Sequence, residues 1–149
     1  MKDRMNIQKV APEAVKGVLQ LESYIRSNVD EKLLHLVKLR ASILNGCAFC
    51  VDMHSTDALK IGESGRRLFA VSAWRESPFF TDVERAALAL TDAITHIGDA
   101  GVPDDVWEAA RAIGTDKQLA DLVMAIVTIN AWNRIAVTFH SQPPPEPAR

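Results

Sequence analysis

Two cysteines and a histidine follow one another at helical spacing near the middle of the chain. Cys47 and Cys50 are three residues apart, and His54 follows four residues later. At about 100° per residue, these offsets place the three side chains along one stripe of a helix. A thiolate attacks peroxides and disulfides, and a second cysteine nearby can resolve the intermediate into a disulfide. The spacing therefore indicates a redox-active dithiol with an imidazole close enough to carry protons.

The residues just before the pair favour a reactive thiol. Asn45-Gly46 is typical of a helix end, so Cys47 is expected at the start of the next helix. Backbone N–H groups that are unpaired at a helix start favour negative charge and acidify a thiol placed there. By this reasoning Cys47, which lies nearer the helix start than Cys50, is the better nucleophile.

His35 is a further candidate because of the geometry of a helical hairpin. If the chain reverses at Asn45-Gly46, His35 lies roughly 15 Å before the turn and His54 roughly 12 Å after it, at ~1.5 Å per residue. Packed antiparallel, the two rings reach similar depth and could share a water or a proton. His35 also belongs to a polar stripe on its own helix, made of His35, Lys38, Ser42 and Asn45. That stripe is equally well interpreted as the solvent-facing edge of the helix.

Two other interpretations of the cysteine pair stay open. The four ligands of a zinc site are present in Cys47, Cys50, His54 and His35. Three ligands on one helix stripe are not the usual zinc-finger spacing, however, and no second Cys/His cluster follows. The pair could also be two inert buried thiols, without redox or metal chemistry.

The elements that must position these residues are helices throughout. Alternating β-branched patterns of strand length are hard to find, and turn signals divide the sequence into segments of helical length. Thr81 and Glu84 have the spacing of a capping box at a helix start. The predicted class is all-α, in a single domain over 1–149 with a core at about 12–140 and an extended or disordered proline-rich tail at 141–149. The predicted helices cover about 12–28, 30–45, 47–61, 64–74, 81–97, 103–113 and 116–139.

Charge and composition argue against several kinds of partner and cellular location. The 149 residues carry a formal net charge of −2 and no block of Lys and Arg, which argues against nucleic acid or anionic membrane as the main partner. The polar N-terminus lacks the apolar core of a signal peptide, and no uninterrupted apolar run approaches the ~18 residues of a membrane span. We therefore expect a cytoplasmic protein without a membrane partner. In that compartment a close cysteine pair is more often catalytic or metal-binding than a permanent crosslink.

The segment from 36 to 54 resembles the core of the alkylhydroperoxidase AhpD/carboxymuconolactone decarboxylase family. It reads Leu-Val-Lys-Leu-Arg-Ala-Ser at 36–42 and Asn-Gly-Cys-Ala-Phe-Cys-Val-Asp-Met-His at 45–54. The stretches 84–89 and 129–134 (Ile-Asn-Ala-Trp-Asn-Arg) resemble the AhpD-like branch as well, so the match extends over about 12–140. The resemblance implies an AhpD-like fold with the cysteine pair at a helix start after a hairpin turn. It also implies a homo-oligomer, commonly a trimer or hexamer.

The resemblance further implies reduction of a hydroperoxide or disulfide, with reducing equivalents from a small thiol or a protein reductant and no other cofactor. By position, Cys50 matches the family's peroxide-attacking cysteine, Cys47 its resolving cysteine and His54 its proton-relay histidine. This order is the reverse of the one that helix-start chemistry favours, and the sequence leaves the choice open.

The chain departs from the peroxidase pattern at two positions. His35 stands where the family has a relay glutamate, and Phe49 stands where the peroxidase has an additional histidine. A neutral imidazole can accept a proton as a carboxylate can, but His35 and His54 cannot both be cationic without repelling each other. Two alternatives follow, a lyase of the decarboxylase branch, which does not need the pair, and a non-catalytic zinc-binding or redox-sensing module. Because both thiols are retained, we favour the redox branch.

Overall fold

The computed structural model describes residues 3–145, and these form eight α-helices, one short 3-10 helix and no strand. The all-α prediction is confirmed. Residues 141–145 follow the last helix without regular structure, whereas the rest of the expected tail, 146–149, lies outside the described residues. The helices are α1 (Ile7–Val10), α2 (Pro12–Asn28), α3 (Glu31–Leu44), α4 (Ala48–Lys60), α5 (Gly65–Ala70), η1 (Val71–Ala73), α6 (Asp82–Thr95), α7 (Asp104–Arg111) and α8 (Asp116–Phe139).

Helix starts fall where capping residues predict them. The Asp30 carboxylate accepts a hydrogen bond from the Leu33 backbone N–H at the start of α3, at 3.0 Å. Thr81 and Glu84 form the expected capping box at the start of α6. The predicted helix at 64–74 is wrong in one respect, because α5 gives way to the 3-10 turn η1. The single turn α1 was not predicted, since four residues are too few to show a hydrophobic period.

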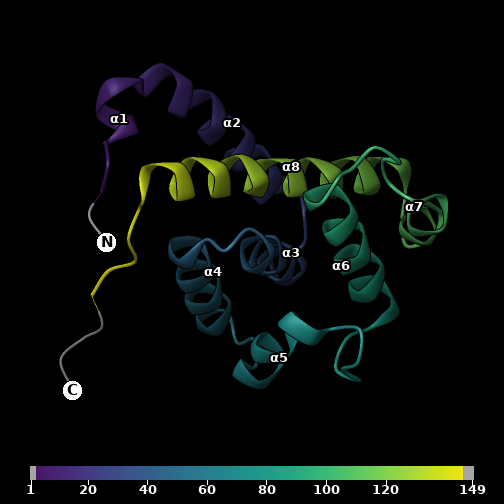
Figure 1. Cartoon of the computed structure of the whole chain (residues 1–149). Coiled ribbons are helices and arrows are strands. Elements are labelled where there is room, and N and C mark those ends of the chain that lie inside the picture. The colour runs from purple at the N-terminus through teal and green to yellow at the C-terminus, as the bar shows by residue number, and fades with distance from the viewer. Residues whose placement is uncertain (1–2, 146–149) are drawn as a thin grey trace.

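Helix α3 lies at the centre of the bundle. It packs against α4, α6 and α8, and α2 runs along α8 (Figure 1). Because neighbours surround α3, its polar stripe is buried as well as its apolar residues. The exposed fractions are 6% for His35, 1% for Lys38 and 0% for Ser42. The interpretation of this stripe as a solvent-facing edge is therefore wrong.

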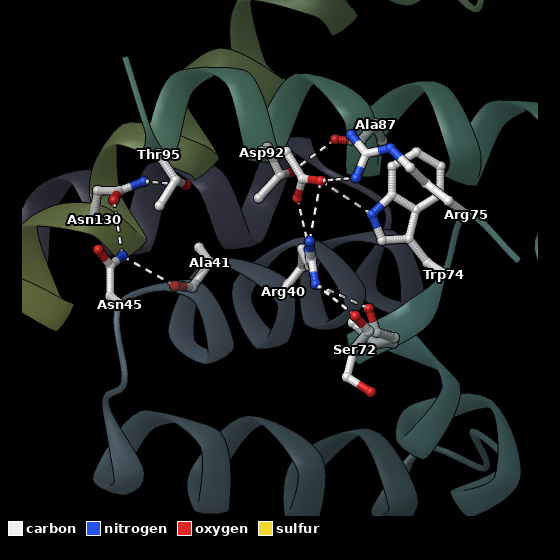
Figure 2. A network of polar contacts seen from close by, with 12 residues as sticks. Arg40, Ala41, Asn45, Ser72, Trp74, Arg75, Ala87, Asp92, Thr95 and Asn130 are labelled. Carbon is white, nitrogen blue, oxygen red and sulfur yellow. Dashed lines mark hydrogen bonds and ion pairs between the residues drawn. The ribbon is translucent and has the colours of Figure 1, made fainter. Parts of the chain in front are cut away.

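A polar network joins the far side of α3 to α6 and η1 (Figure 2). The Arg40 guanidinium donates to both carboxylate oxygens of Asp92, from Nε at 2.6 Å and from Nη2 at 3.1 Å. Its Nη1 donates to the backbone carbonyls of Val71 and Ser72, at 3.4 and 3.1 Å. The Trp74 indole N–H donates to the same carboxylate at 3.2 Å. Two parallel bonds of this kind fix direction as well as distance, so the network holds three elements in register.

Helix α8 is long and apolar enough to span a membrane by length and composition, with a mean hydropathy of 1.5. In the structure it packs against α2, α3 and α6 instead. It also carries buried polar residues, among them Asp121 and Asn133, which are hydrogen-bonded to other helices. A long helix in the core of a helical bundle meets the same length and hydropathy criterion, and α8 is such a core helix.

Candidate active site

A tight turn between α3 and α4 places the cysteine pair. The Gly46 N–H donates to the Ile43 carbonyl at 3.2 Å, and the Cys47 N–H donates to the Ser42 carbonyl at 3.0 Å. These two bonds form a Schellman motif, whose penultimate residue must adopt a left-handed conformation. Gly46 does so, with φ of +64°. The motif ends α3 and leaves Cys47 as the N-cap of α4, as the sequence predicts.

Both cysteines are reduced and buried at the start of α4. The Cys47 Sγ accepts a hydrogen bond from the Cys50 backbone N–H at 3.4 Å, in the manner of an N-cap side chain. The hydrogen bond from the Cys50 thiol, this backbone N–H and the Asn133 amide lower the pKa of Cys47 to about 6, against the opposing effect of burial. The same hydrogen bond between the two thiols, together with burial, raises the pKa of Cys50. These shifts favour a single negative charge on the pair at neutral pH, with Cys47 as the more acidic thiol.

Asparagines from α8 support the turn from behind. The Asn45 amide donates to the side-chain oxygens of Asn130 and Asn133, at 3.0 Å each. Asn133 in turn donates to the Ser42 hydroxyl at 3.1 Å. Figure 2 shows the bond from Asn130 to the Thr95 hydroxyl on α6, which is 3.1 Å long. These bonds satisfy polar groups that burial would otherwise leave unpaired. They also fix the end of α3, and with it Cys47, against α8.

The thiolate on Cys47 has a measurable consequence. The ultraviolet absorbance of the thiolate in the reduced protein should rise with pH through a midpoint near 6, because deprotonation of Cys47 is favoured above that pH. In Asn133→Ala the midpoint should move to higher pH, since one donor to the sulfur is lost. A midpoint near the ordinary thiol value of about 8.5 in the unmodified protein would contradict this charge assignment.

The two histidines lie close together, as the hairpin geometry predicts. The centroids of the His35 and His54 rings are 6.0 Å apart, with the ring planes at 56°. Burial and the positive charge of Lys38 lower the pKa of both, that of His54 to about 3. Both rings are therefore neutral at physiological pH. The Nδ1 atom of each is buried and has no hydrogen-bond partner among residues 3–145, which leaves room for a bridging water or a proton transfer.

A buried ion pair beside these rings was not predicted from the sequence. Lys38 Nζ donates to Glu22 Oε1 at 2.5 Å, and Arg26 Nε donates to the same oxygen at 2.7 Å. Burial alone would raise the pKa of Glu22, but the hydrogen bonds and charges of Lys38 and Arg26 outweigh it and lower that pKa. Burial lowers the pKa of Lys38 despite its partner. The second carboxylate oxygen, Oε2, is buried without a partner in the described part of the chain.

Two cavities flank this ion pair. The larger, of about 460 Å³, is bordered by α2, α4, α8 and the N-terminal segment, and its wall includes Cys50, His54, Glu22, Phe49, Met53 and Trp132. The smaller, of about 270 Å³, is lined by Arg26, Glu31, Leu34, His35 and Lys38. Of the four predicted site residues, Cys50 and His54 face the larger cavity. His35 faces the smaller one, and Cys47 lines neither.

The donors of the zinc alternative do not converge on one point. In the described residues no group of three or more His, Cys, Asp and Glu side chains is placed to hold a metal ion. The geometry brings Cys50 and His54 to one cavity wall, whereas His35 lines the other cavity and Cys47 lines neither. It fits proton and sulfur chemistry better than tetrahedral coordination, which needs four donors around one ion.

A cysteine pair at a helix start, with a histidine one turn below it in an all-helical bundle, defines the AhpD-like class of proteins. The chain belongs to the carboxymuconolactone decarboxylase family, whose model matches residues 11–93. It is 40% identical over 138 residues to the uncharacterized protein YdfG of Bacillus subtilis (strain 168), covering 92% of this chain and 94% of YdfG.

Solved structures of other proteins have the same fold as this chain. A protein of unknown function from Agrobacterium tumefaciens, whose name connects it with the antioxidant defence protein AhpD, superposes with a TM-score of 0.94. It is 49% identical, and the match covers 97% of this chain and all of that one. The debrominase Bmp8 has a TM-score of 0.80 at 18% identity, covering 92% of this chain and 74% of its own. At that identity the likeness to Bmp8 concerns the fold alone.

Proposed function

We propose that this protein is a thiol-dependent hydroperoxide reductase that works through a Cys47–Cys50 dithiol cycle. The observation that carries the proposal is that the two cysteines have different surroundings, since only one of them faces a cavity. Cys50 faces a cavity that it shares with His54, and Cys47 lies behind it with its sulfur bonded to the Cys50 backbone N–H. An attacking thiol needs access to substrate, and a resolving thiol needs only access to the first sulfur. This supports Cys50 as the nucleophile.

The cycle balances without a metal or an organic cofactor. The Cys50 proton passes to Cys47, and the Cys50 thiolate attacks the terminal oxygen of the hydroperoxide. An S–O bond forms, the O–O bond breaks, and the departing alkoxide takes up a proton to become an alcohol. Cys47 then attacks the Cys50 sulfenic acid, which forms the disulfide and releases its oxygen as water with the Cys47 proton. An external thiol or protein reductant restores both thiols by exchange.

His54 serves as the relay group at the cavity wall. A neutral imidazole can accept a proton at one nitrogen while it gives one up from the other, so it passes a proton on without holding a net charge. His35, with its ring 6.0 Å away, is close enough to exchange a proton with His54 through one water. In this scheme the two rings replace the carboxylate–imidazole relay that the sequence resemblance led us to expect.

The cavity wall favours an organic hydroperoxide over hydrogen peroxide. Phe49, Met53 and Trp132 present apolar surface beside Cys50, and a cavity of about 460 Å³ accommodates a substituted hydrocarbon. We also propose a homo-oligomer such as a trimer or hexamer, as the sequence resemblance implies. We place the cycle in the cytoplasm, where thiol reductants are available.

The test is consumption of cumene hydroperoxide by the metal-free protein with a dithiol reductant. The wild-type protein should exceed the reductant alone, and His54→Ala should lose about 10²-fold, the usual contribution of a positioned proton-transfer group. His96→Ala is the matched control, because His96 caps the end of α6 away from the cavity wall. Wild-type consumption no faster than the reductant alone would contradict the proposal.

A further inference from the structure

The proposed cycle needs a proton at one particular step. The alkoxide that the hydroperoxide expels when Cys50 attacks is strongly basic and must be protonated as the O–O bond breaks. The Cys47 proton is already used to release water from the sulfenic acid. The rings of His35 and His54 are neutral, because burial and the charge of Lys38 hold the pKa of both below its ordinary value. They can pass a proton on, but neither ring holds a spare one.

Among the charged groups around the two rings, only one can supply the proton that the alkoxide needs. Those that act on them from α2, α3 and α4 in the described chain are Glu22, Arg26, Glu31, Lys38 and Asp57. The three carboxylates are acceptors, and an Arg guanidinium does not release its proton in proteins. Lys38 is left, and burial lowers the pKa of its ammonium, so its proton is easier to remove than that of an exposed lysine.

The Glu22–Lys38 contact also joins the two cavities. Glu22 lines the larger cavity with Cys50 and His54, while Lys38 lines the smaller one with His35. Lys38 Nζ and Glu22 Oε1 are 2.5 Å apart, so a proton can cross between them. The other carboxylate oxygen, Oε2, has no partner in residues 3–145, so once Oε1 has taken the proton the carboxyl group is free to turn and present it to the larger cavity.

We propose that the Glu22–Lys38 ion pair is the acid of the peroxide-reducing step, with Glu22 as the catalytic residue that delivers the proton and Lys38 as the positioning residue that stores it. This inference rests on the proposed function. As the O–O bond breaks, the proton moves from Lys38 to Glu22 and from Glu22 to the alkoxide, either directly or through His54. Alcohol leaves, and Lys38 is left neutral beside the Glu22 carboxylate. When the external dithiol reduces the disulfide, the proton that the pair then releases restores the Lys38 ammonium through the smaller cavity and His35.

A comparison of two peroxides separates this role from a structural one. Cumene hydroperoxide expels an alkoxide, which needs a proton, whereas peracetic acid expels acetate, a weak base that needs none. Single-turnover oxidation of the reduced protein is measured with both, in wild type and in Glu22→Gln and Lys38→Arg. Lys38→Arg keeps the positive charge but holds its proton firmly. Glu13→Gln is the matched control, since Glu13 lies on the same helix with 85% of its side chain exposed.

Both variants should be slowed about 10²-fold with cumene hydroperoxide and should keep the wild-type rate with peracetic acid. Glu13→Gln should match wild type with both. Equal losses with the two peroxides, or no loss with either, would overturn the relay and leave the dithiol cycle standing. A wild-type protein that does not react with cumene hydroperoxide would overturn the dithiol cycle and the relay together, because no alkoxide would then need protonation.

Discussion

Cys50→Ser should abolish hydroperoxide consumption, with a loss of more than about 10³-fold that leaves only the background rate of the reductant. The reason is that Cys50 is the thiol on the cavity wall, whereas Cys47 does not line the cavity. The measurement is steady-state consumption of cumene hydroperoxide with a dithiol reductant. Unchanged folding is checked by far-ultraviolet circular dichroism, because a serine at this position removes no packing contact larger than one sulfur atom.

Cys47→Ser distinguishes the two cysteines. This variant keeps the thiol at the cavity and should react once, giving a Cys50 sulfenic acid that a dimedone probe captures and that cannot close to a disulfide. If Cys47 were the nucleophile, the probe would label Cys50→Ser instead. A lyase of the same family would behave differently again, since it would keep its activity on a ring-derived acid when both cysteines are serine.

Arg40→Met should lower the stability of the fold more than any single surface change. It removes one partner of the buried Arg40–Asp92 pair and leaves the carbonyls of Val71 and Ser72 without their donor. Breaking a buried pair in this way typically costs about 3–5 kcal/mol. Because Asp92 keeps a second partner in Arg75, we expect about 3 kcal/mol, which corresponds to a fall in Tm of roughly 10 °C.

Arg75→Met is the matched control for this prediction. Arg75 contacts the same carboxylate at 2.5 Å, but 59% of its side chain is exposed to solvent. Its loss should therefore cost less than about 1 kcal/mol, as is usual for surface pairs. Thermal unfolding followed by circular dichroism measures both variants. A Tm for Arg40→Met within a degree of that for Arg75→Met would show that the network does not hold α3 in register.

The parts of the fold that depend on neighbouring residues could be predicted from the sequence. The Schellman turn at Gly46, the N-cap at Asp30 and the capping box at Thr81 all follow from residue types within four positions of one another. The same local chemistry placed Cys47 at a helix start. It also brought His35 and His54 to the same depth, because two helices joined by a tight turn must pack side by side.

The ion pair could not be predicted in the same way. A lysine within an apolar helix signals either a surface position or a buried partner, and periodicity does not separate the two. Lys38 is buried where α2, docked along α8, brings Glu22, sixteen positions earlier, to its ammonium. That docking is a property of the assembled core. Glu22 is one of several carboxylates in the sequence, and its residue type alone does not distinguish it as the partner of Lys38.

Which cysteine attacks the peroxide likewise could not be predicted from residues that are neighbours in the sequence. The hydrogen bond from the Cys50 thiol, more than the backbone N–H at the helix start, lowers the pKa of Cys47, and yet Cys50 is the cysteine that faces the cavity. The more acidic thiol is thus Cys47, whereas the thiol that is accessible from the cavity is Cys50. The cavity is bordered by α2, α4, α8 and residues near the N-terminus, so no segment of sequence taken alone reveals which thiol borders it.

The most direct test of the dithiol cycle is to treat the reduced, metal-free protein with one equivalent of cumene hydroperoxide and analyse the product by mass spectrometry. The dithiol cycle predicts the loss of two hydrogens and a peptide that contains a Cys47–Cys50 disulfide, with one cumyl alcohol formed per chain. Recovery of both free thiols with the hydroperoxide intact would contradict it.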